Sequence, residues 1–222
     1  MTIEGLIFDF DGLILDTETP EFILLQEIFN SYGASLPITE YAAALGASLE
    51  AFDPFVYLAQ KINKPLDQHA LLFNWRAQSN KIIERQDPLP GVVKTIQRAQ
   101  ELGLRMAIAS SSPRDWVVNH LTRLKLIDKF EHVLTAEDVQ KIKPEPDLYL
   151  KSLAALKLKP SEAMAFEDSP NGIKAARKAG LFCIAVLNPL TRQLDTDHAD
   201  LVIDSLASVS LDELIEKANP RV

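Results

Sequence analysis

Six short apolar runs recur along the chain, and each of them ends at a polar residue. The runs cover residues 5–8, 104–109, 132–134, 163–166, 182–187 and 201–203. Runs of this length suit strands, and their nearly continuous apolarity predicts a parallel sheet that is buried on both faces. This pattern constrains the chain to an α/β fold, because helices on both sides of the sheet would be needed to cover such strands.

Helical patterns alternate with these runs. They span residues 92–102, 116–126, 148–158 and 173–179, and Gly103 and Gly180 close the first and the last of them. Strands that alternate with helices predict a doubly wound, Rossmann-like parallel sheet, in which ligands bind at the carboxyl ends of the strands. The acids and hydroxyls that end the apolar runs are therefore expected to gather at one edge of the sheet.

One long segment, residues 17–86, breaks this alternation and carries only helical patterns. Three apolar helix faces are predicted in it: Phe22, Leu25, Ile28, Phe29 and Tyr32; Phe52, Phe55, Val56 and Ala59; and Leu71, Leu72, Trp75, Ile82 and Ile83. The turn at residues 88–91, Pro-Leu-Pro-Gly, marks the return to the α/β pattern. We therefore predict an α/β core of residues 1–16 and 87–222, with an all-helical cap of residues 17–86 inserted after the first strand.

Charge and composition narrow the function classes. The 222-residue chain has a net charge of −8 and no run of lysines or arginines, which argues against a nucleic-acid partner. No apolar run reaches membrane-spanning length, and the acidic start of the sequence does not resemble a signal peptide, so we expect a cytoplasmic protein with no membrane partner. The single cysteine, Cys183, lies in an apolar run and is interpreted as a core residue. We expect a monomer.

Two aspartates, Asp9 and Asp11, follow the first apolar run and flank Phe10. Carboxylates at this spacing, just beyond a buried strand, can face the same crevice. A carboxylate nucleophile needs a partner that gives a proton to the leaving oxygen and later takes one from water. Asp9 as nucleophile and Asp11 as general acid/base fit that division, although a polar turn at the end of a strand has the same sequence.

A second acid pair, Glu167 and Asp168, ends the fourth apolar run. Acidic residues also suit a helix N-terminus, which is the alternative interpretation of this pair. That alternative does not explain why two strand ends should place four carboxylates in one crevice, because like charges repel there unless a cation binds them. Mg²⁺ prefers oxygen ligands and pairs with phosphate, so the four acids predict a magnesium site.

Two further side chains could contact a phosphoryl group. Lys143 stands in the stretch Lys-Pro-Glu-Pro-Asp of residues 143–147, which the two prolines keep out of a helix. Ser110 ends the second apolar run, and its hydroxyl and the adjacent backbone N–H groups, including that of Ser111, could bind phosphoryl oxygens. The alternatives are a solvated loop lysine and a serine-rich helix cap.

Taken together, four motifs resemble those of the haloacid dehalogenase (HAD) superfamily, and specifically its β-phosphoglucomutase-like phosphatase branch. The motifs are DFDGLILDTE at residues 9–18, IASSS at 108–112, KPEPD at 143–147 and FEDSPNG at 166–172. They occur in the family's order across nearly the whole chain, and the helical insert corresponds to the family's small cap.

The resemblance implies a magnesium-dependent phosphatase. Asp9 would attack phosphorus and form an aspartyl-phosphate, while Asp11 would protonate the leaving alcohol and then activate water. The Asp9 carboxylate, the Asp11 backbone carbonyl and Asp168 would hold Mg²⁺, with Glu167 assisting directly or through water. Ser110, Ser111 and Lys143 would bind the phosphoryl group.

The cap residues favour hydrolysis over phosphomutation. The sugar phosphomutases of this branch carry a histidine where this chain has Glu21, and two cations around the glycine of a cap loop that here reads Ala-Leu-Gly-Ala-Ser at residues 44–48. Glu18, in the sequence Asp-Thr-Glu of residues 16–18, resembles the residue found at this position in the phosphatases of the branch. We expect Glu18, Gly46 and Arg76 to contact the substrate, a small phosphorylated metabolite such as a sugar phosphate.

Two other functions compete with this prediction. A phosphomutase would share the fold, but the missing cap cations argue against it. A receiver-type phosphoacceptor module would share the acid cluster, a hydroxyl and a lysine. Receivers are much shorter and lack the helical segment of residues 17–86, which separates the two hypotheses.

Overall fold

The computed structural model describes residues 2–47 and 52–219, and its centre is a six-stranded, entirely parallel sheet. The strands are β1 (Gly5–Phe8), β2 (Arg105–Ala109), β3 (His132–Leu134), β4 (Ala163–Glu167), β5 (Phe182–Val186) and β6 (Leu201–Ile203). Their order in the sheet is β3-β2-β1-β4-β5-β6. All six apolar runs are strands, and the predicted doubly wound fold is confirmed.

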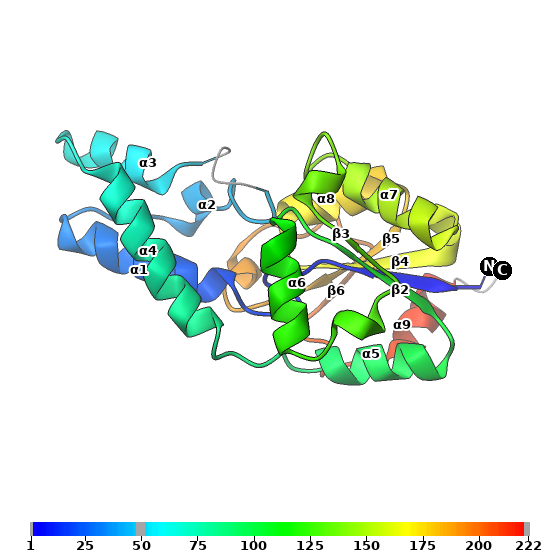
Figure 1. Cartoon of the computed structure of the whole chain (residues 1–222). Helices are drawn as coiled ribbons and strands as arrows, with labels where there is room; N and C mark the ends of the chain where they lie inside the picture. Colours follow the sequence, from blue (N-terminus) through cyan, green and yellow to red (C-terminus); the bar gives the residue numbers. More distant parts are fainter. Residues whose placement is uncertain (1, 48–51, 220–222) are drawn as a thin grey trace.

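Helices cover both faces of the sheet (Figure 1). One face carries α5 (Val92–Glu101), α6 (Arg114–Arg123) and α9 (Leu211–Ala218), and the other carries α7 (Asp147–Leu156) and α8 (Pro170–Lys178). Side chains alternate between the faces along each strand, so that Leu6 and Phe8 join one hydrophobic cluster while Ile7 joins the other. This double burial is the reason that the strands read as continuous apolar runs.

Helix ends differ from the predicted ones by a few residues, because prolines and capping side chains start the helices. The predicted helix 173–179 begins at Pro170, where proline supplies the dihedral angle of a first helical residue and the Ser169 side chain accepts from the backbone N–H of Gly172. The predicted helix 116–126 is α6, which follows Pro113 directly and ends at Arg123. Four short 3₁₀ helices complete the core: η1 (Ile127–Lys129), η2 (Ala136–Asp138), η3 (Pro160–Glu162) and η4 (Thr191–Gln193).

The segment after β1 is helical, as predicted, and lies beyond one end of the sheet (Figure 1). It contains α1 (Glu18–Ser31), α2 (Ile38–Tyr41), α3 (Pro54–Ile62) and α4 (Gln68–Ile83). A third hydrophobic cluster, which includes Phe29, Phe55 and Trp75 together with Leu190 of the segment after β5, holds these helices together. We propose that it forms the cap, with the core built from residues before 17 and after 86.

Three residues predicted on the apolar faces of the cap are instead exposed. The exposed fractions are 42% for Tyr32, 39% for Val56 and 43% for Ile82. Tyr32 follows the last residue of α1, so it does not continue that helix face. Val56 and Ile82 each adjoin a buried residue, Phe55 or Ile83, and successive helix residues point about 100° apart, so only one of each pair faces the core.

Cys183 is buried and unpaired on β5, which confirms its interpretation as a core residue. No helix among residues 2–47 and 52–219 has the length and apolarity needed to cross a membrane.

Candidate active site

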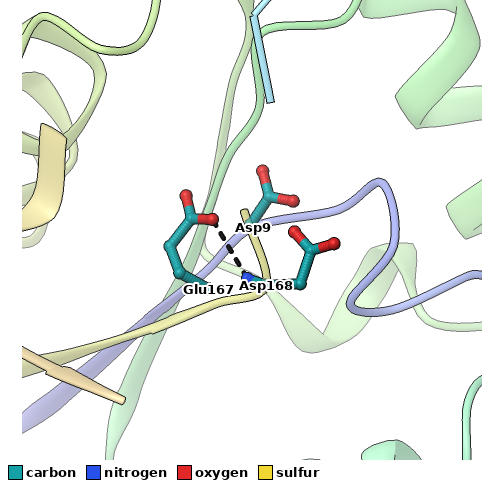
Figure 2. Close-up of side chains that lie close together, drawn as sticks. All are labelled: Asp9, Glu167 and Asp168. Atoms are coloured by element: carbon teal, nitrogen blue, oxygen red, sulfur yellow. Dashed lines mark hydrogen bonds between the residues drawn. The ribbon is translucent and has the colours of Figure 1, made fainter. Parts of the chain in front are cut away.

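The site lies where β1 and β4 run side by side at the centre of the sheet. After β1 the chain continues to β2 on one side of this pair, and after β4 it continues to β5 on the other side. Such a reversal of strand order opens a crevice at the carboxyl ends of the strands. Asp9 follows β1, Glu167 ends β4 and Asp168 comes next. Figure 2 shows the three carboxylates on the same side of the strand ends, all buried, with one oxygen of each lying within 4.8 Å of the others. The structure thus brings together three of the four predicted acids.

Lys143 reaches into this group from the loop before α7, and its side chain is fully buried. Its Nζ donates to Asp9 Oδ1 and lies 2.6 Å from Glu167 Oε1. The Tyr149 hydroxyl also donates to Glu167 Oε1, and the backbone N–H of Asp168 donates to Glu167 Oε2 over 3.2 Å. Glu167 therefore anchors the lysine, and the interpretation of Lys143 as a solvated loop residue is wrong.

The positive charge of Lys143 does not balance the three acids. Burial, helped by the charges of Glu167 and Asp11, raises the pKa of Asp9 to about 8 although Lys143 opposes the shift. Burial and the charges of Asp9 and Glu167 likewise raise the pKa of Asp168 well above its ordinary value. Burial alone would lower the pKa of Lys143, but the two carboxylates outweigh it and raise that pKa.

An unsatisfied oxygen shows where a cation fits. Asp168 Oδ2 accepts from Asn188 Nδ2 at 2.8 Å, whereas the buried Oδ1 meets no N–H donor among the described residues. A buried oxygen without a partner is costly, and a cation would satisfy it. Carboxylate oxygens with surplus negative charge fit a hard divalent ion such as Mg²⁺.

Gly12 allows the chain to turn at this point. It has a φ of +76°, and a Cβ there would overlap the carboxylates of Asp168 and Glu18. Its carbonyl oxygen accepts from Asn188 Nδ2 at 3.1 Å. We did not predict a role for Asn188, although it ends the fifth apolar run, a position shared with the other site residues.

The Asp11 side chain lies outside the group of three acids. Its Oδ1 accepts from Thr17 Oγ1 and from Trp116 Nε1, each at 2.9 Å, and its Oδ2 accepts from Ser112 Oγ at 2.6 Å. Ser110 Oγ lies 3.4 Å from the same Oδ2. The Asp11 side chain is therefore not part of the carboxylate group that could hold a cation. Thr17 belongs to the first motif, but nothing in the sequence marks Trp116 or Ser112 as contacts of Asp11.

A pocket of about 300 Å³ opens between the strand ends and the cap. Asp9 and Asp11 form part of its wall, together with Ser111 and Trp116 of the core. The cap contributes Glu18, Glu21, Tyr41, Gly46, Trp75, Arg76 and Asn80. The three cap residues predicted to contact substrate, Glu18, Gly46 and Arg76, therefore all line the pocket. Ser110 is buried and is absent from the lining formed by described residues.

The cap wall of the pocket is acidic. Burial first, and then the charge of Asp11, raise the pKa of Glu21 to about 8, although Arg76 and a hydrogen bond to Tyr41 oppose the shift. Burial and the charge of Asp168 raise the pKa of Glu18 well above its ordinary value. Within the lining formed by described residues, Arg76 is the one cation.

Direct contacts join the cap to the core beside this pocket. Ser111 Oγ donates to the carbonyl of Gly46 at 2.9 Å, and Asn171 Nδ2 donates to the carbonyl of Leu45 at 2.9 Å. Gly46 has a φ of +67°, and a Cβ there would overlap the Ser169 hydroxyl, so the close approach requires glycine. Ser48, the last residue of the predicted cap loop, lies outside the described residues.

Comparison with known families agrees with this fold. The family profile described as "Haloacid dehalogenase-like hydrolase" matches residues 6–186, most of the chain. The chain belongs to the haloacid dehalogenase-like hydrolase family. This confirms the resemblance seen in the motifs.

Relatives of this HAD hydrolase include named phosphatases. YhcW of Bacillus subtilis (strain 168), named as a candidate phosphatase, is 42% identical over 217 residues, which is 98% of either chain. Hexitol phosphatase B of Escherichia coli (strain K12) is 30% identical over 213 residues, covering 94% of this chain and 95% of its own. The crystal structure of β-phosphoglucomutase from Clostridium difficile superimposes with a TM-score of 0.76 at 23% identity, covering 98% of this chain and 97% of that chain, a likeness of fold alone.

The HAD hydrolase is an enzyme that acts on phosphoric monoesters. The receiver-type phosphoacceptor module is not supported, because the family consists of hydrolases and because the chain carries the helical segment that receivers lack.

Proposed function

We propose that this HAD hydrolase is a cytoplasmic, monomeric, Mg²⁺-dependent phosphatase that releases phosphate from a small phosphorylated metabolite, a sugar phosphate or a related polyol phosphate, through an aspartyl-phosphate on Asp9. One observation carries the proposal. The buried Asp9 carboxylate contacts Lys143 at the base of a pocket that Asp11 also lines. The cytoplasmic location and the monomeric state rest on the sequence arguments alone.

The proposed reaction has two displacements. An Asp9 carboxylate oxygen attacks phosphorus while the bond from phosphorus to the ester oxygen breaks, and Asp11 gives its proton to that leaving oxygen. Asp11 then takes a proton from water as the water attacks phosphorus, which releases inorganic phosphate and restores both carboxyl groups. Lys143 and the Ser110–Ser111 strand end hold the phosphoryl oxygens during both steps.

The Asp9 carboxylate, Asp168 and the backbone carbonyl of Asp11 would hold Mg²⁺. Asp168 Oδ1, which meets no N–H donor among the described residues, supports this assignment. Both Glu167 oxygens already contact protein donors, so Glu167 would assist without binding the ion directly. Bound Mg²⁺ would offset the negative charge of the acids and of the phosphoryl oxygens.

Metal binding is expected to stabilise the protein measurably. In the metal-free protein, Asp9 has a folded-state pKa of about 8 against an ordinary 3.8, so the folded state binds more protons than the unfolded state between these values. Stability without metal is therefore expected to fall as pH rises from about 4 to about 8. At pH 8, Mg²⁺ at ten times its Kd should add about 1.4 kcal/mol to the free energy of unfolding.

Thermal unfolding with and without Mg²⁺ would measure this effect independently of turnover. Asp168→Asn should lose both the Mg²⁺-dependent rise in Tm and the phosphatase activity, because it halves the charge that Asp9 and Asp168 offer the ion. An equal rise in Tm for the parent and Asp168→Asn would contradict the proposed ligand set.

The pocket supports a substrate with one phosphate and several hydroxyl groups. Glu18, Glu21 and Tyr41 offer hydrogen-bond partners for hydroxyls, whereas a second phosphate would meet two acids and a single arginine. This charge pattern disfavours a phosphomutase, which must hold a bisphosphate. The name of the relative hexitol phosphatase B points to the same class of compound.

Phosphate release from a panel of sugar and polyol monophosphates, with matching bisphosphates, tests the proposed function. We expect Mg²⁺-dependent release that is fastest with monophosphates. Conversion of one sugar monophosphate into its isomer without free phosphate, and only with a bisphosphate activator, would identify a phosphomutase instead. No reaction of either kind would refute both.

Arg76→Ala is expected to raise KM for the best substrate about tenfold with little change in kcat, because one hydrogen bond to a charged group, about 1.5 kcal/mol, is lost before and during the reaction alike. The matched control is Lys81→Ala, since Lys81 lies on the same helix but is absent from the described pocket lining. Steady-state kinetics of both variants would check the prediction, and an equal effect of the two would contradict it.

A further inference from the structure

We propose that Trp116 is a positioning residue for Asp11: its indole N–H fixes the orientation of the carboxyl group that gives a proton to the leaving alcohol. The inference rests on the proposed function. It concerns a side chain on α6 that no motif of the sequence includes.

Two donors occupy the same oxygen of Asp11. Trp116 Nε1 and Thr17 Oγ1 both donate to Oδ1, each over 2.9 Å. An sp² carboxyl oxygen has two in-plane lone pairs, and an indole N–H can only donate. The two bonds to Oδ1 together fix the plane of the Asp11 carboxyl group and leave Oδ2 as the oxygen that they do not engage.

The other carboxyl oxygen, Oδ2, has a hydroxyl partner that can act as donor or acceptor. Ser112 Oγ lies 2.6 Å from Oδ2, and a hydroxyl can donate to a carboxylate or accept from a carboxylic acid after a rotation. Ser110 Oγ lies 3.4 Å from the same oxygen. Both partners of Oδ2 are hydroxyls that can rotate, whereas the indole N–H of Trp116 keeps a fixed direction. A general acid must present its proton in one direction during the reaction, and this arrangement selects that direction.

The indole is itself held in place. Trp116 and His120 lie one turn apart on α6, and their rings meet edge to face with centroids 4.3 Å apart at 72°. His120 is buried and also contacts Phe10, the residue between the two catalytic aspartates, at 6.2 Å between ring centroids. Trp116 lines the same pocket as Asp11 while its N–H donates to that carboxyl group, so it would hold the acid beside the leaving group of a substrate in the pocket.

Trp116→Phe keeps an aromatic ring and removes the N–H, so it tests the inference directly. The readout is kcat/KM for two substrates of similar size: benzyl phosphate, whose alcohol needs a proton to leave, and p-nitrophenyl phosphate, whose phenolate does not. This parameter covers the steps up to departure of the alcohol, so it isolates the acid role of Asp11. We expect a loss of about 10- to 100-fold with benzyl phosphate, part of the contribution of a general acid, and less than about threefold with p-nitrophenyl phosphate.

Trp75→Phe is the matched control, because Trp75 also lines the pocket but its indole N–H donates to the carbonyl of Glu21 at 2.9 Å and not to Asp11. Its effect should be equal for both substrates. Thr17→Val removes the other donor to Oδ1 and should reproduce the selective loss, which keeps the inference testable if Trp116→Phe folds poorly.

Equal losses with both substrates in Trp116→Phe and in Thr17→Val, or an effect on KM alone, would overturn the inference and leave the proposed function intact. A parent enzyme that hydrolyses neither ester nor any monophosphate would overturn the proposed function, and the inference with it.

Discussion

Asp9→Asn is expected to lower phosphatase turnover by at least about 10³-fold, because an amide oxygen is a far weaker nucleophile than a carboxylate and no covalent intermediate can form. The change is nearly isosteric and keeps one oxygen for the Lys143 ammonium group. Lys143 also retains Glu167 at 2.6 Å, so the fold should persist. The loss of turnover should therefore occur in folded protein, which circular dichroism and thermal unfolding would verify.

Asp128→Asn makes the same chemical change at an exposed residue of η1 and should retain parental activity. A second measurement addresses the intermediate itself. Brief reaction of the parent with substrate, followed by acid quenching and mass spectrometry of the peptides, should find one phosphoryl group on the peptide that contains Asp9 and none in Asp9→Asn. Full turnover of Asp9→Asn, or a phosphoryl group on another residue, would refute the nucleophile assignment.

Lys143→Met is expected to cost both stability and activity. Its ammonium group is buried between the carboxylates of Asp9 and Glu167, and methionine would leave these two charges without their cation. Removing one partner of a buried ion pair typically costs about 3–5 kcal/mol, so urea denaturation should report a fall of this size in the free energy of unfolding. Turnover should fall by about 10²- to 10³-fold, because a preorganised positive charge on the phosphoryl oxygens is lost.

Added Mg²⁺ should recover part of the stability but not the turnover of Lys143→Met, because the ion offsets the charge of Asp9 without replacing the contact of Lys143 with substrate. Lys141→Met is the matched control, two residues away, and Lys141 is exposed. It should behave like the parent in both measurements. If the two methionine variants unfold at the same urea concentration, the buried ion pair contributes no net stability.

The carboxyl ends of the strands were predictable because each apolar run stops at a polar residue. Asp9, Ser110 and Asp168 could be placed at one sheet edge from that pattern alone, since parallel strands share an edge. The pattern carries this information because both faces of the sheet are buried, which forces long apolar stretches and makes their ends conspicuous. The four-residue helix α2 escaped prediction because one turn is too short to show a helical period.

The sequence left Lys143 open between a phosphoryl contact and a solvated loop residue, and the cap residues were identifiable only through family resemblance. A lysine that precedes two prolines and an arginine on a helix both look like solvated charges. The structure adds the reason for Lys143: the loop before α7 places its ammonium group against the carboxylates of Asp9 and Glu167. Local spacing cannot predict this contact, because 134 residues separate Lys143 from Asp9.

By itself the sequence determined the layered α/β core, the helical insert and the residues at the strand ends, because burial and periodicity act over a few neighbouring positions. Tertiary structure alone decided which polar atoms face each other there. It left Asp168 Oδ1 without an N–H donor among the residues that the structure describes, placed Glu21 beside Arg76, and brought Trp116 to Asp11 across 105 residues. Such contacts depend on directions and distances between separate elements, and hydrogen bonds depend steeply on both.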